Sequence, residues 1–233
     1  MKNLFILTIA LFSIANLSSC KKKGCTDNTA TNYNSKAKKD DGSCLYVPTI
    51  TIIGASDTTI SVGSTYSDPG ATAENKDGSS VTVTTTGQVN SATVGNYELT
   101  YSASNENGTA TAKRIVHVVI GQDNWLVTWD VSSNCGTSFP LAAAPSVTAG
   151  STANTLVIDN MFNLVGGTAN ATINGATITI PQQTINITVG DVIFSGIGTM
   201  NNQGNILTIT YTYENTTPLI GGSGTCVATY VKQ

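Results

Sequence analysis

Short runs of β-branched and aromatic residues, separated at regular intervals by Gly, Pro, Asn and Asp, are the feature that most constrains the fold of this chain. Tyr97, Leu99, Tyr101 and Ala103 alternate with polar residues, and this period of two predicts a strand with one buried face. β-branched residues favour strands, and Gly and Asn favour the turns between them. Many short strands with turns at this spacing predict an all-β protein.

The chain of 233 residues divides into four predicted parts. Residues 1–19 have the pattern of a signal peptide, and residues 20–46 form a polar stem without an amphipathic period. Residues 47–120 and 121–233 each contain enough predicted strands for a domain. We therefore predict a β-sandwich followed by an antiparallel β-barrel-like domain, with a disulfide-stapled N-terminal stem.

The N-terminus indicates export. Lys2, an apolar segment over residues 4–15 and small residues before Cys20 have the order of a secretory signal, and the apolar run is too short to span a bilayer comfortably. The sequence Leu17-Ser18-Ser19-Cys20 resembles a bacterial lipobox. The resemblance implies cleavage before Cys20, acylation of its thiol and a membrane as partner. We expect an outer-membrane lipoprotein of the cell envelope. Its body faces either the periplasm or the cell surface, and both alternatives stay open.

Charge is placed unevenly along the chain, whose net charge is −3. The stem is rich in lysine, whereas the rest of the mature chain is acidic. A basic stem fits either anionic lipid headgroups or a solvated linker, and both interpretations stay open. The acidic body argues against a nucleic-acid partner, because phosphate binding requires a basic surface.

The 5 cysteines leave no free thiol once Cys20 is assigned to lipidation. An exported chain meets oxidising conditions, so we predict one disulfide between Cys25 and Cys44 and another between Cys135 and Cys226. Cys135 follows the first predicted strand of the last domain and Cys226 lies in its last strand, and these strands are neighbours in an up-and-down barrel. The alternative for the second pair is two separate buried thiols.

The stem resembles a small motif that recurs in exported proteins of Bacteroidetes. The resemblance is carried by Gly24-Cys25-Thr26-Asp27 and by Asp40-Asp41-Gly42-Ser43-Cys44, with Asn32-Tyr33-Asn34 between them. It implies a spacer with no assigned activity. Four oxygen-bearing side chains in it are candidate ligands for a structural Ca²⁺: Asp27, Asn34, Asp40 and Asp41. The alternative is that the same side chains only satisfy local turns.

Residues 47–120 resemble a bacterial Ig-like domain of the type seen in a pesticidal crystal protein and in hyaline-repeat modules. The resemblance is carried by Tyr66-x-Asp68-Pro69-Gly70-Ala71 and by Gly95-x-Tyr97-x-Leu99-Thr100-Tyr101. It implies a spacer or binding scaffold. His117 is the only histidine, and its place among apolar neighbours favours a polar surface position over a ligand or base.

Residues 121–233 predict an antiparallel meander. Eight strands are expected, over residues 125–131, 155–159, 171–173, 177–180, 184–189, 193–198, 206–213 and 225–231. Asn174-Gly175 between two of them is a strong hairpin signal. The sequences Leu156-Val157-Ile158-Asp159-Asn160 and Ala171-Thr172-Ile173-Asn174-Gly175 resemble an uncharacterised lipocalin-like module of Bacteroidetes lipoproteins.

Aromatic residues of this last domain are the candidate ligand contacts. Trp125 and Trp129 fall on one face of a predicted strand, where exposed rings form a stacking platform for sugars and buried rings form a core. Tyr211 and Tyr213 carry the same two interpretations.

Catalysis is not expected, and no catalytic residue or cofactor is predicted. A single histidine excludes a Ser-His-Asp triad and a multi-histidine zinc site. The acids of the last domain fall mostly at strand ends, which does not suggest a paired-carboxylate cleft. The leading hypothesis is a structural or interaction module of the cell envelope with a protein or glycan partner. The alternative is an accessory glycan- or small-ligand-binding lipoprotein of a nutrient uptake system.

Overall fold

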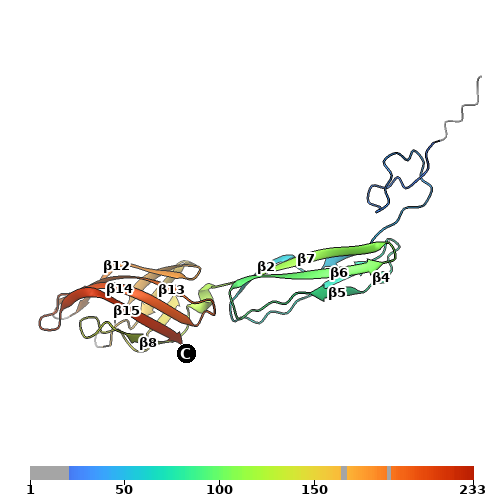
Figure 1. Ribbon diagram of the computed structural model, residues 1–233. Helices are drawn as coiled ribbons and strands as arrows, with labels where there is room; N and C mark the ends of the chain where they lie inside the picture. The colour runs from blue at the N-terminus through green and yellow to red at the C-terminus, as the bar shows by residue number, and fades with distance from the viewer. Residues whose placement is uncertain (1–20, 164–166, 188–189) are drawn as a thin grey trace, which may run out of the picture. The chain divides into compact units, whose positions relative to one another are not determined.

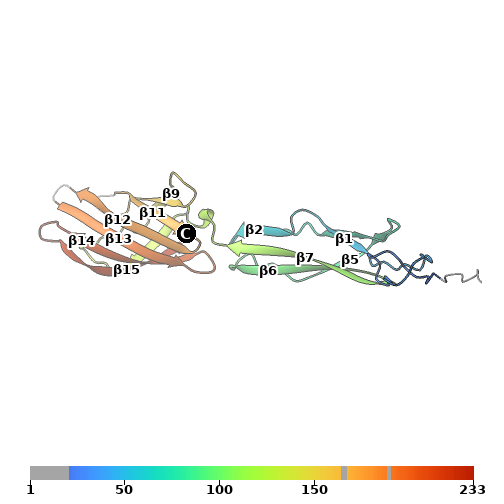
Figure 2. The same cartoon turned by 90° about the horizontal axis from the view of Figure 1, so that it is seen from above.

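Figures 1 and 2 show the computed structural model, which describes residues 21–163, 167–187 and 190–233. Strands and one short 3₁₀ helix, Gln122–Asn124, make up its regular structure, and no α-helix occurs in these ranges. No helix within them has the length and hydropathy needed to cross a membrane. The predicted all-β fold class is confirmed. The predicted signal segment and Cys20 lie outside the described residues.

The contacts divide the chain into two compact units. The first contains the described residues up to Thr51 together with Ala71–Thr84 and Ser102–Ala112, and the second contains Ile52–Gly70, Thr85–Tyr101 and Lys113–Gln233. This division passes through the segment predicted as one domain over residues 47–120, because two of its long strands contribute residues to both units.

The stem is held by the predicted disulfide between Cys25 and Cys44, whose Cα atoms are 4.8 Å apart. Most of its side chains are exposed, although Cys25 itself is buried. The hydroxyl of Tyr46, at the end of the stem, donates a hydrogen bond of 2.7 Å to Asp27 Oδ2. Local turns and one covalent link therefore replace a hydrophobic core.

The carboxylate of Asp27 accepts the hydrogen bonds that stabilise this turn. The backbone N–H of Thr29 donates to its carboxylate, as do the hydroxyls of Thr29 and Tyr46. These hydrogen bonds favour the ionised form and lower the pKa of Asp27 to about 2.

The Ig-like part contains two sheets. One has the order β1-β3-β4, formed by Thr49–Ile52, Ala71–Glu74 and Ser80–Val81. The other has the order β2-β7-β6-β5, formed by Asp57–Ser61, Gly108–Val119, Gly95–Asn105 and Val83–Thr86. Leu99, Tyr101 and Ala103 of β6 are buried, as the alternation predicts.

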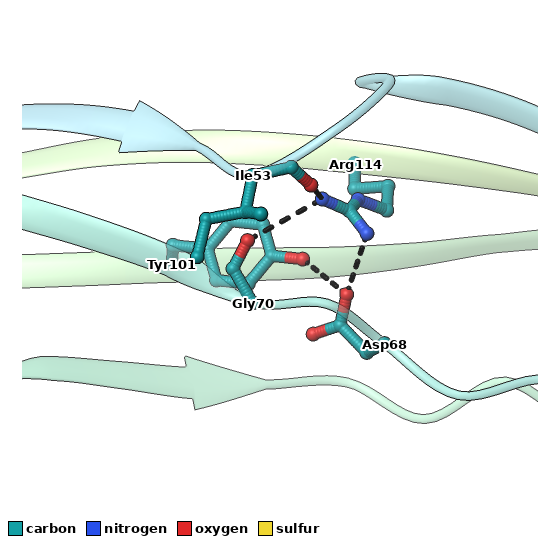
Figure 3. A network of polar contacts seen from close by, with 5 residues as sticks. All are labelled: Ile53, Asp68, Gly70, Tyr101 and Arg114. Atoms are coloured by element: carbon teal, nitrogen blue, oxygen red, sulfur yellow. Dashed lines mark hydrogen bonds and ion pairs between the residues drawn. The ribbon is translucent and has the colours of Figure 1, made fainter.

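A buried arginine organises this part (Figure 3). Arg114 on β7 is only 2% exposed, and its Nη1 lies 2.8 Å from Asp68 Oδ1. Its Nη2 donates to the carbonyl oxygens of Ile53 and Gly70. The hydroxyl of Tyr101 donates a bond of 2.7 Å to the same Asp68 oxygen. Burial of the ring and this hydrogen bond raise the pKa of Tyr101 to about 12.

The C-terminal module is one antiparallel sheet of eight strands in the order β8-β15-β14-β13-β12-β11-β10-β9. The strands are Trp129–Ser133, Ser146–Ala149, Thr155–Asp159, Ala169–Asn174, Thr177–Ile187, Gly190–Met200, Ile206–Asn215 and Gly222–Lys232, numbered β8 to β15. The sheet curls into a half-barrel (Figure 2). Its end strands approach at one bridge, between Thr128 and Ser146.

Two features of the meander follow the sequence prediction. The first and last strands of the module, β8 and β15, are paired. Cys135 and Cys226 form the predicted disulfide, with Cα atoms 4.9 Å apart. Because this disulfide joins β15 to the residues that directly follow β8, it fixes the contact of β8 with β15 and does not bridge the gap between β8 and β9.

Three predicted details are wrong. Trp125 ends the 3₁₀ helix and precedes the first strand, so it shares no strand with Trp129. The two strands expected over residues 177–189 are one strand, β12, with a bulge between Ile180 and Gln183. At this bulge the amide of Gln183 donates to the carbonyl of Asn170 and accepts from its N–H, which replaces ladder bonds that Pro181 disrupts. The third error is strand β9, which was not among the strands predicted from the sequence.

We expect Arg114→Met to lower the free energy of unfolding by about 3 kcal/mol, because it leaves a carboxylate and two carbonyl groups without their buried partner. Urea unfolding of the lipid-free chain measures this. The neighbouring Lys113 pairs with Glu98 in solvent, so Lys113→Met should cost no more than about 0.5 kcal/mol. Equal losses for the two variants would contradict the assignment.

The pKa of Asp27 gives a second prediction. Its folded-state value of about 2 is below the ordinary 3.8, so the stabilisation is present above 3.8 and is lost as the pH falls toward 2. A carboxyl chemical-shift titration should show this low value. Tyr46→Phe should raise it, whereas Tyr33→Phe at an exposed tyrosine of the stem should leave it unchanged. An ordinary pKa in the unsubstituted chain would refute the contact.

Candidate functional site

The two tryptophans proposed as a stacking platform lie in the interior. Trp125 and Trp129 are each 1% exposed. The indole N–H of Trp129 donates a hydrogen bond of 3.3 Å to the carbonyl oxygen of Trp125. Of the two interpretations of these residues, the core is the one that the structure shows, and they offer no surface to a sugar ring.

Phe139 occupies the concave side of the curled sheet. It is fully buried and belongs to a segment between β8 and β9 that forms no strand. Its ring stacks on Tyr213 with centroids 4.9 Å apart and meets Tyr211 at 5.2 Å. It also contacts Phe162 at 5.0 Å and Phe194 at 5.7 Å. Aromatic side chains therefore fill the space that holds a ligand in an open barrel.

Tyr211 also belongs to this interior. Its hydroxyl lies 2.6 Å from that of Tyr230 on the neighbouring strand, and both rings are buried. Burial is the main cause that raises the pKa of both phenols, to about 12 for Tyr230. Both groups stay neutral at physiological pH, and their mutual hydrogen bond satisfies them without a ligand.

Small residues on the sheet make room for these rings. Gly196 and Gly198 on β13 face the interior, and a Cβ atom on Gly198 would lie 2.6 Å from the carbonyl oxygen of Thr208. Ala169, Ala171 and Ala228 face the same side and are buried. The sheet therefore supplies little volume of its own, and the irregular segment that carries Phe139 completes the packing.

Tyr213 is the one predicted aromatic that reaches a surface hollow. It is half-buried, and it lines a groove of about 420 Å³ on β12 to β15. Polar side chains dominate the lining: Gln182, Ser195, Thr212, Glu214, Ser223 and Thr225. Gly224 also lines the groove and leaves space beside the Tyr213 ring.

Strand register explains why these side chains gather. Thr212 on β14 stands opposite Ser195 on β13 and Thr225 on β15. Glu214, two residues further along, stands opposite Ile193 and Ser223. The groove thus offers hydroxyl and amide groups around a single carboxylate, and it can hydrogen-bond a neutral polyhydroxylated molecule.

The alternation of residues along β14 indicates which of its side chains face outward and can line the groove. Thr208, Thr210 and Thr212 alternate with the buried Leu207, Ile209 and Tyr211, which places the threonines on the outer face. The pairing of Thr212 with Ser195 and Thr225 depends on register and was not predicted. The bulge of β12 next to Gln182 was also missed.

The four candidate calcium ligands are engaged in local turns. Asp27 and Asp41 accept hydrogen bonds from Thr29 and Ser43, and Asn34 Oδ1 accepts from the N–H of Lys36. Asp40 accepts from the N–H of Gly42. Across the described ranges, no group of three or more His, Cys, Asp or Glu side chains is arranged to hold a metal ion. A structural Ca²⁺ therefore stays a prediction from the sequence.

A second hollow, of about 390 Å³, lies in the first unit beside Tyr46. The amide of Asn105 donates to the carbonyl of Tyr46 and to Asn75 Oδ1, each at 2.9 Å. Lys76 Nζ lies 4.9 Å above the centre of the Tyr46 ring. These contacts bind the end of the stem to the turn between β6 and β7, and they engage Asn75, Lys76 and Asn105 of the lining.

His117 is held by surface partners. Its Nδ1 lies 2.7 Å from Asn96 Oδ1, and its Nε2 lies 3.2 Å from Asp57 Oδ1. Both partners are exposed, and the imidazole lies on β7 rather than in either hollow. The surface interpretation of His117 agrees with this geometry.

Comparisons with known proteins bear mainly on the Ig-like part. Residues 50–118 match a family model described as the Ig-like domain of bacterial surface proteins. No curated protein matches the chain. Among solved structures, the chain is similar to a lipoprotein from Bacteroides thetaiotaomicron, at 18% identity and a TM-score of 0.32, over 80% of this chain and 100% of that one. The family match confirms the predicted Ig-like domain, which precedes a half-barrel whose interior is filled.

Proposed function

We propose that this chain is a lipid-anchored protein of the cell envelope that displays a non-catalytic interaction module. The observation that carries the proposal is the match of residues 50–118 to a domain of bacterial surface proteins, placed between a lipobox-like N-terminus and the half-barrel. An Ig-like sandwich with a disulfide-stapled stem is suited to the role of a spacer. The two disulfides fit an oxidising compartment outside the cytoplasm.

The interior of the half-barrel supports an interaction role rather than an enclosed ligand. Phe139 and the two tryptophans occupy the volume that a transported molecule needs. Two acids of the module are engaged in local contacts, since Asp191 accepts from Asn186 at 2.7 Å and Asp130 from Gln233 at 2.6 Å. We place the protein at the outer membrane, with its function on its outer surfaces.

The anchor gives the direct test. Cys20→Ala should abolish acylation and either release soluble protein or block processing, because membrane attachment requires acyl chains such as palmitate that contribute about 0.8 kcal/mol per buried methylene. Fractionation and labelling with a fatty-acid analogue measure this. Ser19→Ala retains a small residue before Cys20 and is the matched control. Normal processing and membrane recovery of Cys20→Ala would refute the anchor.

A second candidate function, the binding of a glycan or small ligand for a nutrient uptake system, is favoured by one observation. The groove at Tyr213 presents hydroxyl and amide groups with one carboxylate, which matches the hydrogen-bonding needs of a neutral sugar.

A glycan array probed with the lipid-free chain tests this candidate. Thr225→Leu should fill the groove, because Thr225 is exposed on the outer face of β15 and lines it. We expect binding to fall at least about tenfold, a loss of about 1.4 kcal/mol. Thr148→Leu on the exposed side of β9 is the control. Absence of any bound glycan, or equal binding by both variants, would reject the groove as a sugar site.

A further inference from the structure

The bulge in β12 separates two hollows on the outer face of the C-terminal sheet. On one side is the groove at Tyr213, whose lining includes Gln182. On the other side is a hollow of about 400 Å³ over β10, β11 and β12, whose lining includes Pro181. Pro181 and Gln182 are consecutive, and both are exposed. Two neighbouring residues of one strand therefore border two different hollows.

The bulge explains why both of these side chains reach the outer face. The ladder between β12 and β13 shifts its register between Ile180 and Gln183. Pro181 and Gln182 therefore stand together opposite Ser195 alone. Consecutive side chains of a regular strand point to opposite faces, whereas a bulge sets two residues against one and redirects a side chain.

Strand register places the two hollows at the same height on the sheet. We call the outward side chains that lead from one to the other the crossing row, whose members from β10 to β15 are Val157, Asn170, Pro181, Gln182, Ser195, Thr212 and Thr225. Its neighbours are register partners between β10 and β11, between β13 and β14, and between β14 and β15. Between β11 and β12, the amide of Gln183 bonds both the N–H and the carbonyl of Asn170. The row is therefore one path that runs across the strands.

The length and direction of this path restrict what can occupy it. Strands spaced by about 4.8 Å give a path of about 24 Å from β10 to β15, which is longer than a single sugar residue. Each of these strands has a neighbour on both sides, so its backbone groups are used within the sheet. An extended peptide pairs with the free backbone of an edge strand. A ligand that lies across the middle of this sheet meets side chains instead.

The side chains along the path match the surface of a sugar chain. Amide and hydroxyl groups of the crossing row can each donate and accept hydrogen bonds. Val157 and Pro181 add apolar contact in the hollow on β10 to β12. The row itself is uncharged, and Glu214 at the margin of the Tyr213 groove would repel an anionic chain. A pyranose offers hydroxyl groups at its rim and C–H groups on its faces, so it can use both kinds of contact.

We propose that the two hollows form one binding site for an extended neutral oligosaccharide, which lies across the strands and passes over the β12 bulge. The inference rests on the glycan-binding candidate described above for the groove at Tyr213. It adds a second subsite on β10 to β12 and a preference for long ligands.

Titration calorimetry of the lipid-free chain tests this preference. The probes are neutral gluco-, manno- and xylo-oligosaccharides, each as the disaccharide and as the hexasaccharide. We expect at least one series to bind, with the hexasaccharide at least about tenfold tighter than the disaccharide, because it contacts both hollows at once.

Substitutions separate the two subsites. Asn170→Leu narrows the hollow on β10 to β12 and removes an amide, and it should reduce the advantage of the hexasaccharide to about twofold or less. Thr225→Leu in the Tyr213 groove should weaken the binding of both lengths. Thr208→Leu, at an exposed position of β14 outside both linings, is the control and should change neither affinity.

Amide chemical shifts of the unsubstituted chain give a test that needs no variant. The hexasaccharide should change shifts on β10 and β11 as well as on β13 to β15. Equal affinities for the two lengths, a length advantage that Asn170→Leu leaves intact, or shift changes confined to β13 to β15 would overturn the two-hollow site and leave glycan binding at the groove standing. Failure of every probe to bind would overturn both.

Discussion

The C-terminal module depends on the packing of Phe139. Its sheet presents glycine and alanine at many inward positions, including Gly196 and Gly198, so the strands alone cannot fill the concavity they enclose. Phe139 supplies that volume from an irregular segment and contacts aromatic rings on either side of it. A core built this way is densely packed around the Phe139 ring. These rings occupy the concave side of the described sheet.

The contacts that hold the Phe139 segment show why the second disulfide lies where it does. Cys135 is four residues before Phe139 and is bonded to Cys226 on β15. On the other side, the amide of the buried Asn215 donates to the carbonyl of Ser138 at 2.9 Å. An irregular segment loses more backbone entropy on folding than its own hydrogen bonds offset, so a covalent link across a separation of 91 residues stabilises it by constraining the unfolded chain.

Period-two patterns predicted the strands well, and tertiary contacts explain the errors. Strand β10 begins and ends at the predicted residues 155 and 159, and the inward phase of β7 that buries Val116 and Val118 also places Arg114 inside. The partner of Arg114 could not be deduced, because Asp68 lies 46 residues away. Trp125 was misplaced because the buried amide of Asn124, bonded to the carbonyl of Val62, helps to stabilise a helical turn where alternation indicates a strand. Prediction of the groove at Tyr213 requires the register between strands, which the local sequence does not determine.

Arg114 and the half-barrel illustrate two different uses of charge in one chain. In the Ig-like part a single buried guanidinium joins Asp68 to two backbone carbonyls, so an ion pair takes part in fixing how loops and strands meet. In the half-barrel charge is absent from the core rings and from the middle of the outer face, and only Glu214 carries it into the groove. Hydroxyl groups beside one carboxylate favour directional hydrogen bonds with a small polar molecule. The same strands therefore combine an aromatic interior around Phe139 with a polar groove on their outer face.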